Sequence, residues 1–190
     1  MPSVDLDAME HRLLFQVARR ALGGAQPEDC TPRETLSERL VAPAATFVTL
    51  HHQAALRGCI GSLEAQRPLV EDVAHNAWAA AFRDPRFPPL PASQAEEIHL
   101  SISILGPAEL LQVEGEAELL QTLRPGVDGV ILHDGPHRST FLPAVWEQLP
   151  DPVTFMAALR QKAGLPQRHW SNSLRLWRYT VAVLEEPANA

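Results

Sequence analysis

Residues 98–105 read Ile98-His99-Leu100-Ser101-Ile102-Ser103-Ile104-Leu105, and up to the last residue they alternate between apolar and polar side chains. A period of two places the isoleucines and Leu100 on one face of a strand, and the histidine and serines on the other. One apolar and one polar face are typical of an antiparallel sheet that is covered on one side. The stretch therefore predicts a half-buried strand that pairs with other strands.

Short apolar runs and helical spacings predict the partners of this strand. The main predicted strands are residues 46–50, 56–61, 98–105, 127–132, 139–142 and 174–184, with a shorter one at 109–113. The predicted helices are residues 3–22, 68–82 and 151–162, with a shorter one at 116–123. Strands linked by hairpins and interrupted by helices predict an α+β fold, a mostly antiparallel sheet with flanking helices.

The helix over 68–82 has the strongest pattern. Its apolar residues recur at helical spacing, and Glu71, Asp72, His75 and Asn76 fall on the opposite, polar face. No linker is long enough to separate independent domains. We therefore expect residues 1–190 to form one domain, either as a single body or as two closely packed lobes.

Composition excludes several classes of protein. The chain of 190 residues is 45% hydrophobic and 21% charged, which is ordinary for an ordered globular protein. Its formal net charge of −7 disfavours nucleic acid as a partner. Cys30 and Cys59 form no CxxC pair, so a disulfide has little support. With neither a membrane-spanning run nor a secretion signal in the sequence, we expect a cytoplasmic protein without membrane contact.

The candidate site lies in the stretch Leu56-Arg57-Gly58-Cys59-Ile60-Gly61, which follows the predicted turn at residues 51–54. A guanidinium beside a thiol favours the thiolate, so Arg57 and Cys59 are candidates for chemistry. Gly58 and Gly61 leave the backbone bare, which suits close approach by a ligand or by another segment. The alternative is that Cys59 is a small buried apolar side chain of the strand.

A second candidate segment follows the helix and reads Asp84-Pro85-Arg86-Phe87-Pro88-Pro89. Asp84 and Arg86 are candidates for binding a polar substrate. The alternative is structural: an aspartate accepts backbone N–H bonds at a proline turn, and an arginine pairs with a carboxylate.

Histidines are the sequence's suppliers of a base near neutral pH, and no spacing singles one out for Cys59. His133 and His137 flank a turn that includes Asp134, but two histidines without a third ligand are a weak metal signal. We predict no bound metal and no cofactor.

Several segments together resemble the AMME-syndrome candidate-gene family, whose prokaryotic members are called AmmeMemoRadiSam system protein A. They are residues 56–61, 84–89, 101–105, 126–130, 141–143 and 162–165. The similarity extends from about Leu6 to Glu185. It implies an α+β domain of two unequal lobes with a cleft between them. It also implies two partners, a Memo-like protein similar to extradiol dioxygenases and a radical-SAM protein, but no reaction.

Two functions follow from the residues and the resemblance. In the first, the protein is an accessory binding protein, and the cleft around Cys59 holds a small molecule or a segment of a partner. In the second, it is an enzyme that uses Cys59 as a nucleophile or redox thiol on a small polar substrate. Arg57 would then favour the thiolate or hold an anion, and Asp84 with Arg86 would orient the substrate.

Overall fold

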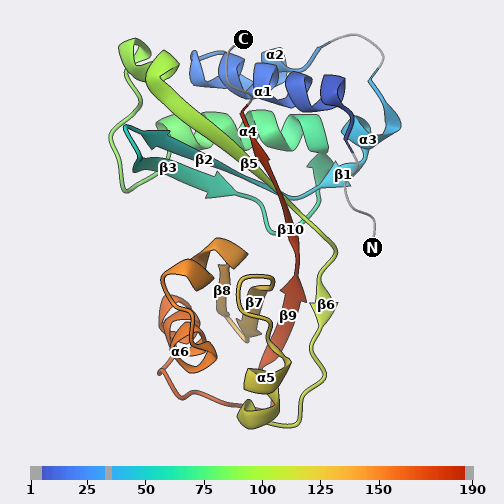
Figure 1. Ribbon diagram of the computed structural model, residues 1–190, viewed down its shortest axis with the longest axis vertical. Coiled ribbons are helices and arrows are strands. Elements are labelled where there is room, and N and C mark those ends of the chain that lie inside the picture. Colours follow the sequence, from blue (N-terminus) through green and yellow to red (C-terminus); the bar gives the residue numbers. More distant parts are fainter. Residues whose placement is uncertain (1–5, 33–35, 187–190) are drawn as a thin grey trace. The chain divides into compact units, whose positions relative to one another are not determined.

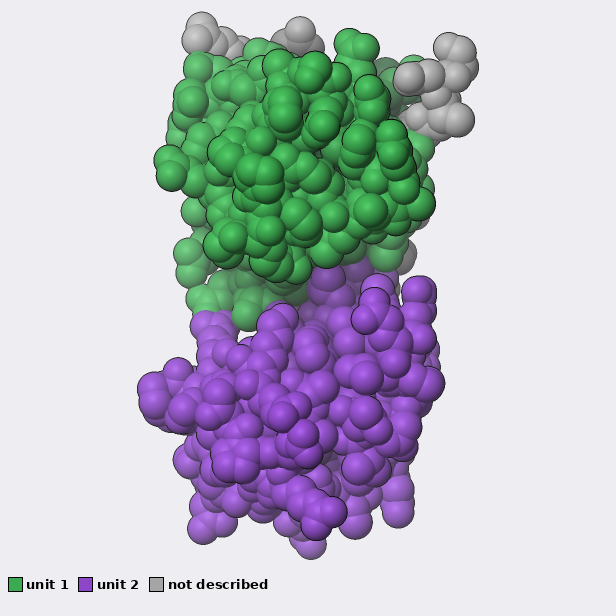
Figure 2. Space-filling view, turned by 90° about the vertical axis from the view of Figure 1, so that its left-hand side faces the viewer, with its two compact units in different colours: residues 1–105, 182–190 green, residues 106–181 purple. Residues whose placement is uncertain are grey.

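The structure, a computed structural model, describes residues 6–32 and 36–186. The chain forms two compact units (Figure 2). Unit 1 comprises residues 1–105 and 182–190, and unit 2 comprises residues 106–181. Unit 2 is therefore an insertion in the sequence of unit 1. That the two units act as one domain with a cleft between them stays a prediction.

Unit 1 is an antiparallel sheet with helices on one face (Figure 1). Its strands follow the order β10-β5-β2-β3, and a small pair, β1 and β4, lies apart. The helices of unit 1 are α1 (Ala8–Leu22), α2 (Pro27–Cys30), α3 (Glu38–Val41), α4 (Leu69–Phe82) and the 3-10 helix η1 (Ala92–Glu97). Its strands are β1 (Pro43–Ala44), β2 (Thr46–His52), β3 (Ala55–Gly61), β4 (Arg67–Pro68), β5 (Ile98–Leu105) and β10 (Val181–Glu185).

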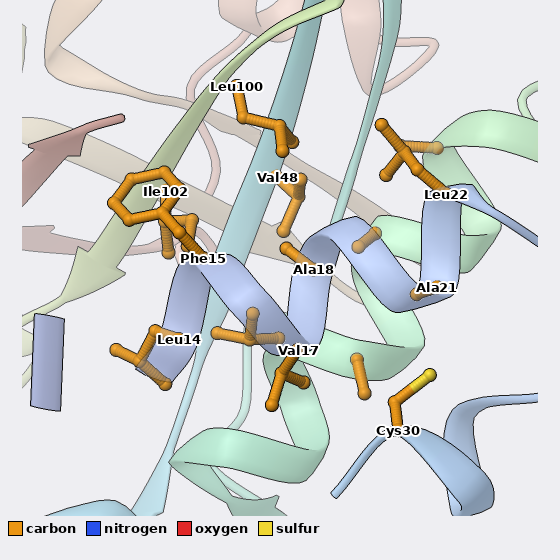
Figure 3. Packing of buried hydrophobic residues seen from close by; sticks show 14 of the residues in the cluster. Leu14, Phe15, Val17, Ala18, Ala21, Leu22, Cys30, Val48, Leu100 and Ile102 are labelled. Carbon is orange, nitrogen blue, oxygen red and sulfur yellow. The ribbon is translucent and has the colours of Figure 1, made fainter. Parts of the chain in front are cut away.

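The core of unit 1 lies between this sheet and the helices α1 and α4. The even-numbered residues of β5 from 98 to 104 are all at most 2% exposed. Figure 3 shows Leu100 and Ile102 of β5 near side chains of α1 such as Phe15 and Ala18. The predicted strand and its apolar face are confirmed. Of the helix predicted over residues 3–22, residues 3–5 lie outside the described part of the chain.

The polar face of α4 is not where the sequence pattern places it. Asp72 is 0% exposed and Asn76 is 5% exposed. Asp72 Oδ2 accepts hydrogen bonds from the backbone N (2.9 Å) and the hydroxyl (2.8 Å) of Thr46, and its Oδ1 accepts one from the Ser62 hydroxyl (2.8 Å). Asn76 Nδ2 donates to the Thr46 carbonyl at 3.0 Å. Asp72 and Asn76 are buried because they provide hydrogen-bond partners for the buried start of β2. The prediction from helical periodicity that they face solvent is therefore wrong.

The hairpin of β2 and β3 differs in detail from the prediction. Its turn is only Gln53 and Ala54, with φ of 50° and 65°, which is the left-handed region that a two-residue hairpin loop needs. Leu50 pairs with Gly58 and His51 with Leu56, so Arg57 is an extra residue in β3. Such a β-bulge redirects a side chain relative to strict alternation.

Unit 2 is built on a second antiparallel sheet, with the strand order β6-β9-β7-β8. Its strands are β6 (Glu109–Leu110), β7 (Gly129–Asp134), β8 (His137–Phe141) and β9 (Arg175–Tyr179). Its helices are α5 (Glu116–Thr122), the 3-10 helix η2 (Pro143–Glu147) and α6 (Pro152–Lys162). In its core the rings of Trp146 and Phe155 stack with centroids 3.7 Å apart.

The single strand predicted over residues 174–184 is two strands in different units. β9 belongs to the sheet of unit 2, and β10 pairs with β5 in unit 1. The chain changes sheets at Thr180, between the two strands. No helix in the described part of the chain combines the length and the apolar character needed to cross a bilayer.

Candidate functional site

Cys59 lies in β3, at the edge of the unit 1 sheet, beside the segment that follows α4. A Cβ atom added to Gly58 would lie 2.3 Å from the backbone oxygen of Ala80 in α4, so Gly58 faces the helix. Neighbouring residues of a strand point to opposite faces. Cys59 therefore faces away from the core of α1 and α4, and its side chain is partly exposed. The alternative of a fully buried Cys59 is wrong.

The backbone of Cys59 is bound on its open side by Asp84 and Arg86, which we call the edge clamp. Its N–H donates to Asp84 Oδ2 at 2.9 Å, and its carbonyl accepts from Arg86 Nη2 at 3.2 Å. A carboxylate and a guanidinium thus replace the acceptor and donor that a further strand would offer. The sequence segment from 84 to 89 and the cysteine stretch therefore meet in space.

The edge clamp is an ion pair with two parallel contacts. Arg86 Nη2 lies 2.7 Å from Asp84 Oδ2, and Nε lies 3.0 Å from Oδ1. The hydrogen bonds from Arg86, foremost among several causes, lower the pKa of Asp84 to about 2. Asp84 in turn raises the pKa of Arg86, with a smaller contribution from the Cys59 thiol. Arg86 is therefore a guanidinium bound to the Cys59 carbonyl, and Asp84 remains ionised at neutral pH.

The thiol of Cys59 has one hydrogen bond from a neighbouring strand. Thr49 lies opposite Cys59 in β2, and its hydroxyl donates to Sγ at 3.4 Å. Within residues 6–32 and 36–186, no histidine forms a hydrogen bond to Cys59. In the hairpin, His52 Nε2 is instead 2.8 Å from a carboxylate oxygen of Glu97.

Arg57 points toward the segment that carries the edge clamp. Its Nη2 donates to the Pro88 carbonyl at 2.7 Å. The guanidinium carbons of Arg57 and Arg86 lie 5.8 Å and 5.4 Å from the ring centroid of Phe87, within the range of cation–π attraction. The Nη1 of Arg57 is buried without a hydrogen-bond partner. The bulge in β3 therefore places a second cation near the edge clamp.

The two glycines of the stretch serve the packing of β3. Gly58 allows the close approach to α4, since any side chain there would meet the Ala80 backbone. Gly61 pairs with Phe47, and a Cβ at position 61 would lie 2.2 Å from Phe47 Cγ. An aromatic ring over a cross-strand glycine is a known way to cover bare backbone in a sheet. A direct binding role for either glycine stays a prediction.

A second polar cluster, in unit 2, was not found from the sequence. Asp134 Oδ2 is 2.6 Å from His169 Nε2 and accepts from the Ser171 hydroxyl at 2.7 Å, and its Oδ1 accepts from the Ser173 hydroxyl. The hydrogen bond from Ser173 is the largest cause that holds the pKa of Asp134 well below its usual range. Both serines donate to Asp134 itself, so this is not a relay from serine through histidine. The cluster fastens the segment between α6 and β9 to the end of β7.

The cluster has only a weak signal in the sequence. His169, Ser171 and Ser173 alternate, but nothing local connects them with Asp134. The two histidines that gave the weak metal signal have other neighbours: His137 Nδ1 lies 2.9 Å from the Ala163 carbonyl oxygen, and His133 lies near the Trp177 ring. The described residues contain no group of three or more histidine, cysteine, aspartate or glutamate side chains that could hold a metal ion. The expectation of no metal stays a prediction.

Comparison with known proteins agrees with the fold and with the resemblance in sequence. A Methanocaldococcus jannaschii protein, MJ0810, is 38% identical over 148 residues, 74% of this chain and 72% of that protein. A Methanopyrus kandleri protein, MK0488, is 34% identical over 187 residues, 93% of this chain and 88% of that protein. Neither name states an activity.

A solved structure has the same fold. It is the crystal structure of the uncharacterized protein PH0010 from Pyrococcus horikoshii, with a TM-score of 0.77 and 31% identity. The match covers 90% of this chain and 89% of that one. The model of the AMMECR1 family matches residues 14–184. The chain belongs to the AMMECR1 family.

Proposed function

We propose that this AMMECR1 family member is an accessory binding protein, which acts with a Memo-like protein and a radical-SAM protein. Its site is the surface around Cys59, formed by Arg57, Phe87 and the edge clamp of Asp84 and Arg86. The site holds an anionic group, either on a small molecule or on a segment of one partner. The partners come from the family resemblance, and the anionic group comes from the two guanidiniums.

The state of Asp84 is the observation that favours binding over catalysis. A nucleophilic thiol needs a neighbouring base or another means of activation. Asp84 is the acid nearest the Cys59 backbone, but both its oxygens are bound to Arg86 and one also to the Cys59 N–H. With its pKa at about 2 it does not take up a proton at neutral pH. It supports the strand rather than the thiol.

The charge of the site supports an anionic ligand. Arg57 and Arg86 contribute two positive charges, and Asp84 contributes one negative charge. The Arg57 side chain is partly exposed and the Arg86 side chain is half-exposed, so a ligand can reach both. A carboxylate or phosphate on the ligand would bind them, since guanidinium groups bind such anions with charge-assisted hydrogen bonds.

Co-purification tests the binding function. A tagged wild-type chain should retain the Memo-like and radical-SAM proteins encoded by the same organism. Arg57→Ala should reduce the retained amount about tenfold, which corresponds to the loss of one charge-assisted hydrogen bond. Arg168→Ala is the matched control, because Arg168 is an exposed arginine of unit 2. Failure of the wild-type chain to retain either protein would contradict the proposed partners.

One observation favours the second function, an enzyme that uses Cys59. The Thr49 hydroxyl donates to Sγ at 3.4 Å, and Arg86 Nη2 donates to the Cys59 carbonyl at 3.2 Å, so a hydroxyl and a cation both lie beside the cysteine. Cys59 is also partly exposed, whereas Cys30 is buried. This function would use Cys59 as the nucleophile and Arg86 together with Arg57 as the groups that hold an anionic substrate.

Alkylation with iodoacetamide at several pH values separates the two functions. If Cys59 is a catalytic thiol, it should be alkylated rapidly at pH 7, and Arg86→Gln should slow the reaction. Cys30 should not interfere, because it is 0% exposed and burial raises the pKa of its thiol. Cys59→Ser provides the background rate. If Cys59 is alkylated no faster than a free thiol, and Arg86→Gln leaves that rate unchanged, the enzymatic function of Cys59 is excluded.

A further inference from the structure

A cavity of about 910 Å³ lies beside α1 in unit 1, and the proposed function does not use it. Arg12, Phe15, Gln16, Arg19 and Arg20 of α1 line it, together with Glu96 of η1. Glu186, just after β10, also lines it. The volume is within the range of small-molecule sites, roughly 300–1,000 Å³.

One wall of the cavity is fixed by Arg19. Its Nε and Nη2 bind the carboxylate of Glu186 at 2.7 Å and 2.5 Å. Its Nη1 donates to the Ala95 carbonyl at 2.7 Å, and its Nη2 also donates to the Ile98 carbonyl at 2.6 Å. Arg19 thus connects α1, η1 and the end of β10. Because Arg19 and Glu186 neutralise each other, neither is the ligand-binding charge.

The remaining charge in the cavity is positive and lies along one face of α1. Arg12, Gln16 and Arg20 follow at intervals of four residues and are all exposed. Nothing in the described part of the chain bonds to the Arg12 guanidinium, while Arg20 gives one Nη2 hydrogen bond to the Asp29 carbonyl at 2.7 Å. Apart from the pair of Arg19 and Glu186, the described residues that line the cavity carry two positive charges, those of these arginines, and one negative charge, that of Glu96. A positive cavity is unusual in a chain with a formal net charge of −7.

We propose that this cavity binds a small organic molecule with an anionic group, a carboxylate or a phosphate, at each of its two ends. Arg12 and Arg20 are eight residues apart, so their Cα atoms are about 12 Å apart along the helix. Each guanidinium holds one anionic group in a fork of N–H donors. The Gln16 amide lies between them, and the apolar middle of the ligand lies against Phe15.

Among the described residues, Glu96 is the one lining carboxylate that is not paired with Arg19. It lines the cavity without a described partner and carries the same sign of charge as the ligand. Like charges repel, so Glu96 weakens the binding of an anion. Removing its charge should therefore strengthen binding, an effect opposite to that of removing Arg12 or Arg20.

Titration calorimetry with suberate, a linear dicarboxylate, and separately with 1,6-hexanediol bisphosphate, an apolar chain with a phosphate at each end, tests the proposal and distinguishes the two kinds of anion. We expect at least one probe to bind the wild-type chain with a Kd of millimolar or below. The double variant Arg12→Gln with Arg20→Gln should weaken binding at least about tenfold, the effect of losing one or two charge-assisted hydrogen bonds. Glu96→Gln should strengthen it two- to threefold, as expected for one partly screened like charge.

Arg168→Gln is the control for unspecific attraction, because it removes an exposed arginine from unit 2 and leaves the cavity intact. It should bind as the wild type does. Three results would each overturn the proposal: neither probe binds, the double variant binds as tightly as the wild type, or Arg168→Gln loses as much affinity as the double variant. None of these results depends on Cys59 or on the proposed partners.

Discussion

Gly58→Ala is expected to lower the free energy of unfolding by about 3 kcal/mol, at the upper end of what added atoms in a packed core usually cost. The new methyl group would lie 2.3 Å from the Ala80 carbonyl oxygen and 3.4 Å from Leu50 Cδ1. The oxygen belongs to the backbone of the last turn of α4, so it cannot move aside as a flexible side chain can. β3 would have to shift away from α4, and Cys59 would shift with it.

Urea denaturation followed by circular dichroism measures this effect. The matched control is Gly115→Ala in unit 2, because a Cβ at Gly115 meets nothing within 4 Å and its φ of −169° suits any residue. Gly115→Ala should leave the midpoint almost unchanged. Equal midpoints for the two variants would mean that β3 does not lie against α4 as described.

Asp84→Ala should have the second large effect, a loss of about 3 kcal/mol. The substitution leaves the Cys59 N–H without an acceptor, which costs roughly 1–3 kcal/mol where water cannot replace it. It also removes the partner of Arg86, although Arg86 is half-exposed and can return to water. Asp84→Asn keeps one acceptor and should lose less. Asp29→Ala, at an exposed aspartate of unit 1, is the control and should be close to neutral.

The effect of Asp84→Ala should depend on pH. The pKa of Asp84 is about 2 in the folded chain, against an ordinary 3.8. Its charge therefore stabilises the fold above pH 3.8, and this contribution disappears as the pH falls toward 2. At neutral pH the charge of Asp84 contributes on the order of 2 kcal/mol to the free energy of unfolding. Solvent screening at the half-exposed Arg86 reduces this contribution.

The measurement is the difference in free energy of unfolding between the wild type and Asp84→Ala, at pH 7 and again near pH 3. We expect the difference to shrink at the lower pH, because only the wild type loses the contribution of Asp84. Asp134, whose pKa is also lowered, is present in both proteins and cancels. A difference that stays constant would show that the edge clamp is not an ion pair.

Local patterns predicted the elements well where a single physical cause decides them. β5 follows from the alternation of residues 98–105, and α6 starts at Pro152 after the capping side chain of Asp151. Residues 174–184 were predicted as a single strand because apolar and polar side chains alternate in both of its parts. The apolar positions nevertheless change from even to odd between Leu176 and Val181, which is the trace of the break at Thr180.

The candidate site was harder to predict because its contacts are distant in the sequence. Arg57 is two residues before Cys59, so the sequence predicted it as the cation beside the thiol. Arg86, by contrast, comes from the segment after α4 and binds the Cys59 carbonyl. The alternation of residues in β3 does not indicate that the side chains of Asp84 and Arg86 bind its open edge. For the same reason Asp134 and His169 were not connected: a hydrogen bond across 35 residues leaves no local pattern.

The insertion of unit 2 bears on the order in which the chain can fold. β5 and β10 are neighbours in the sheet of unit 1, yet residues 106–180 separate them in sequence. Closing so long a flexible loop costs entropy before the strand pair forms. Within unit 2, however, Gly106 N donates to the Thr180 carbonyl at 2.8 Å, so its first and last segments are held together. Once unit 2 has folded, it acts as a turn, and β10 joins β5 as the second arm of a hairpin would.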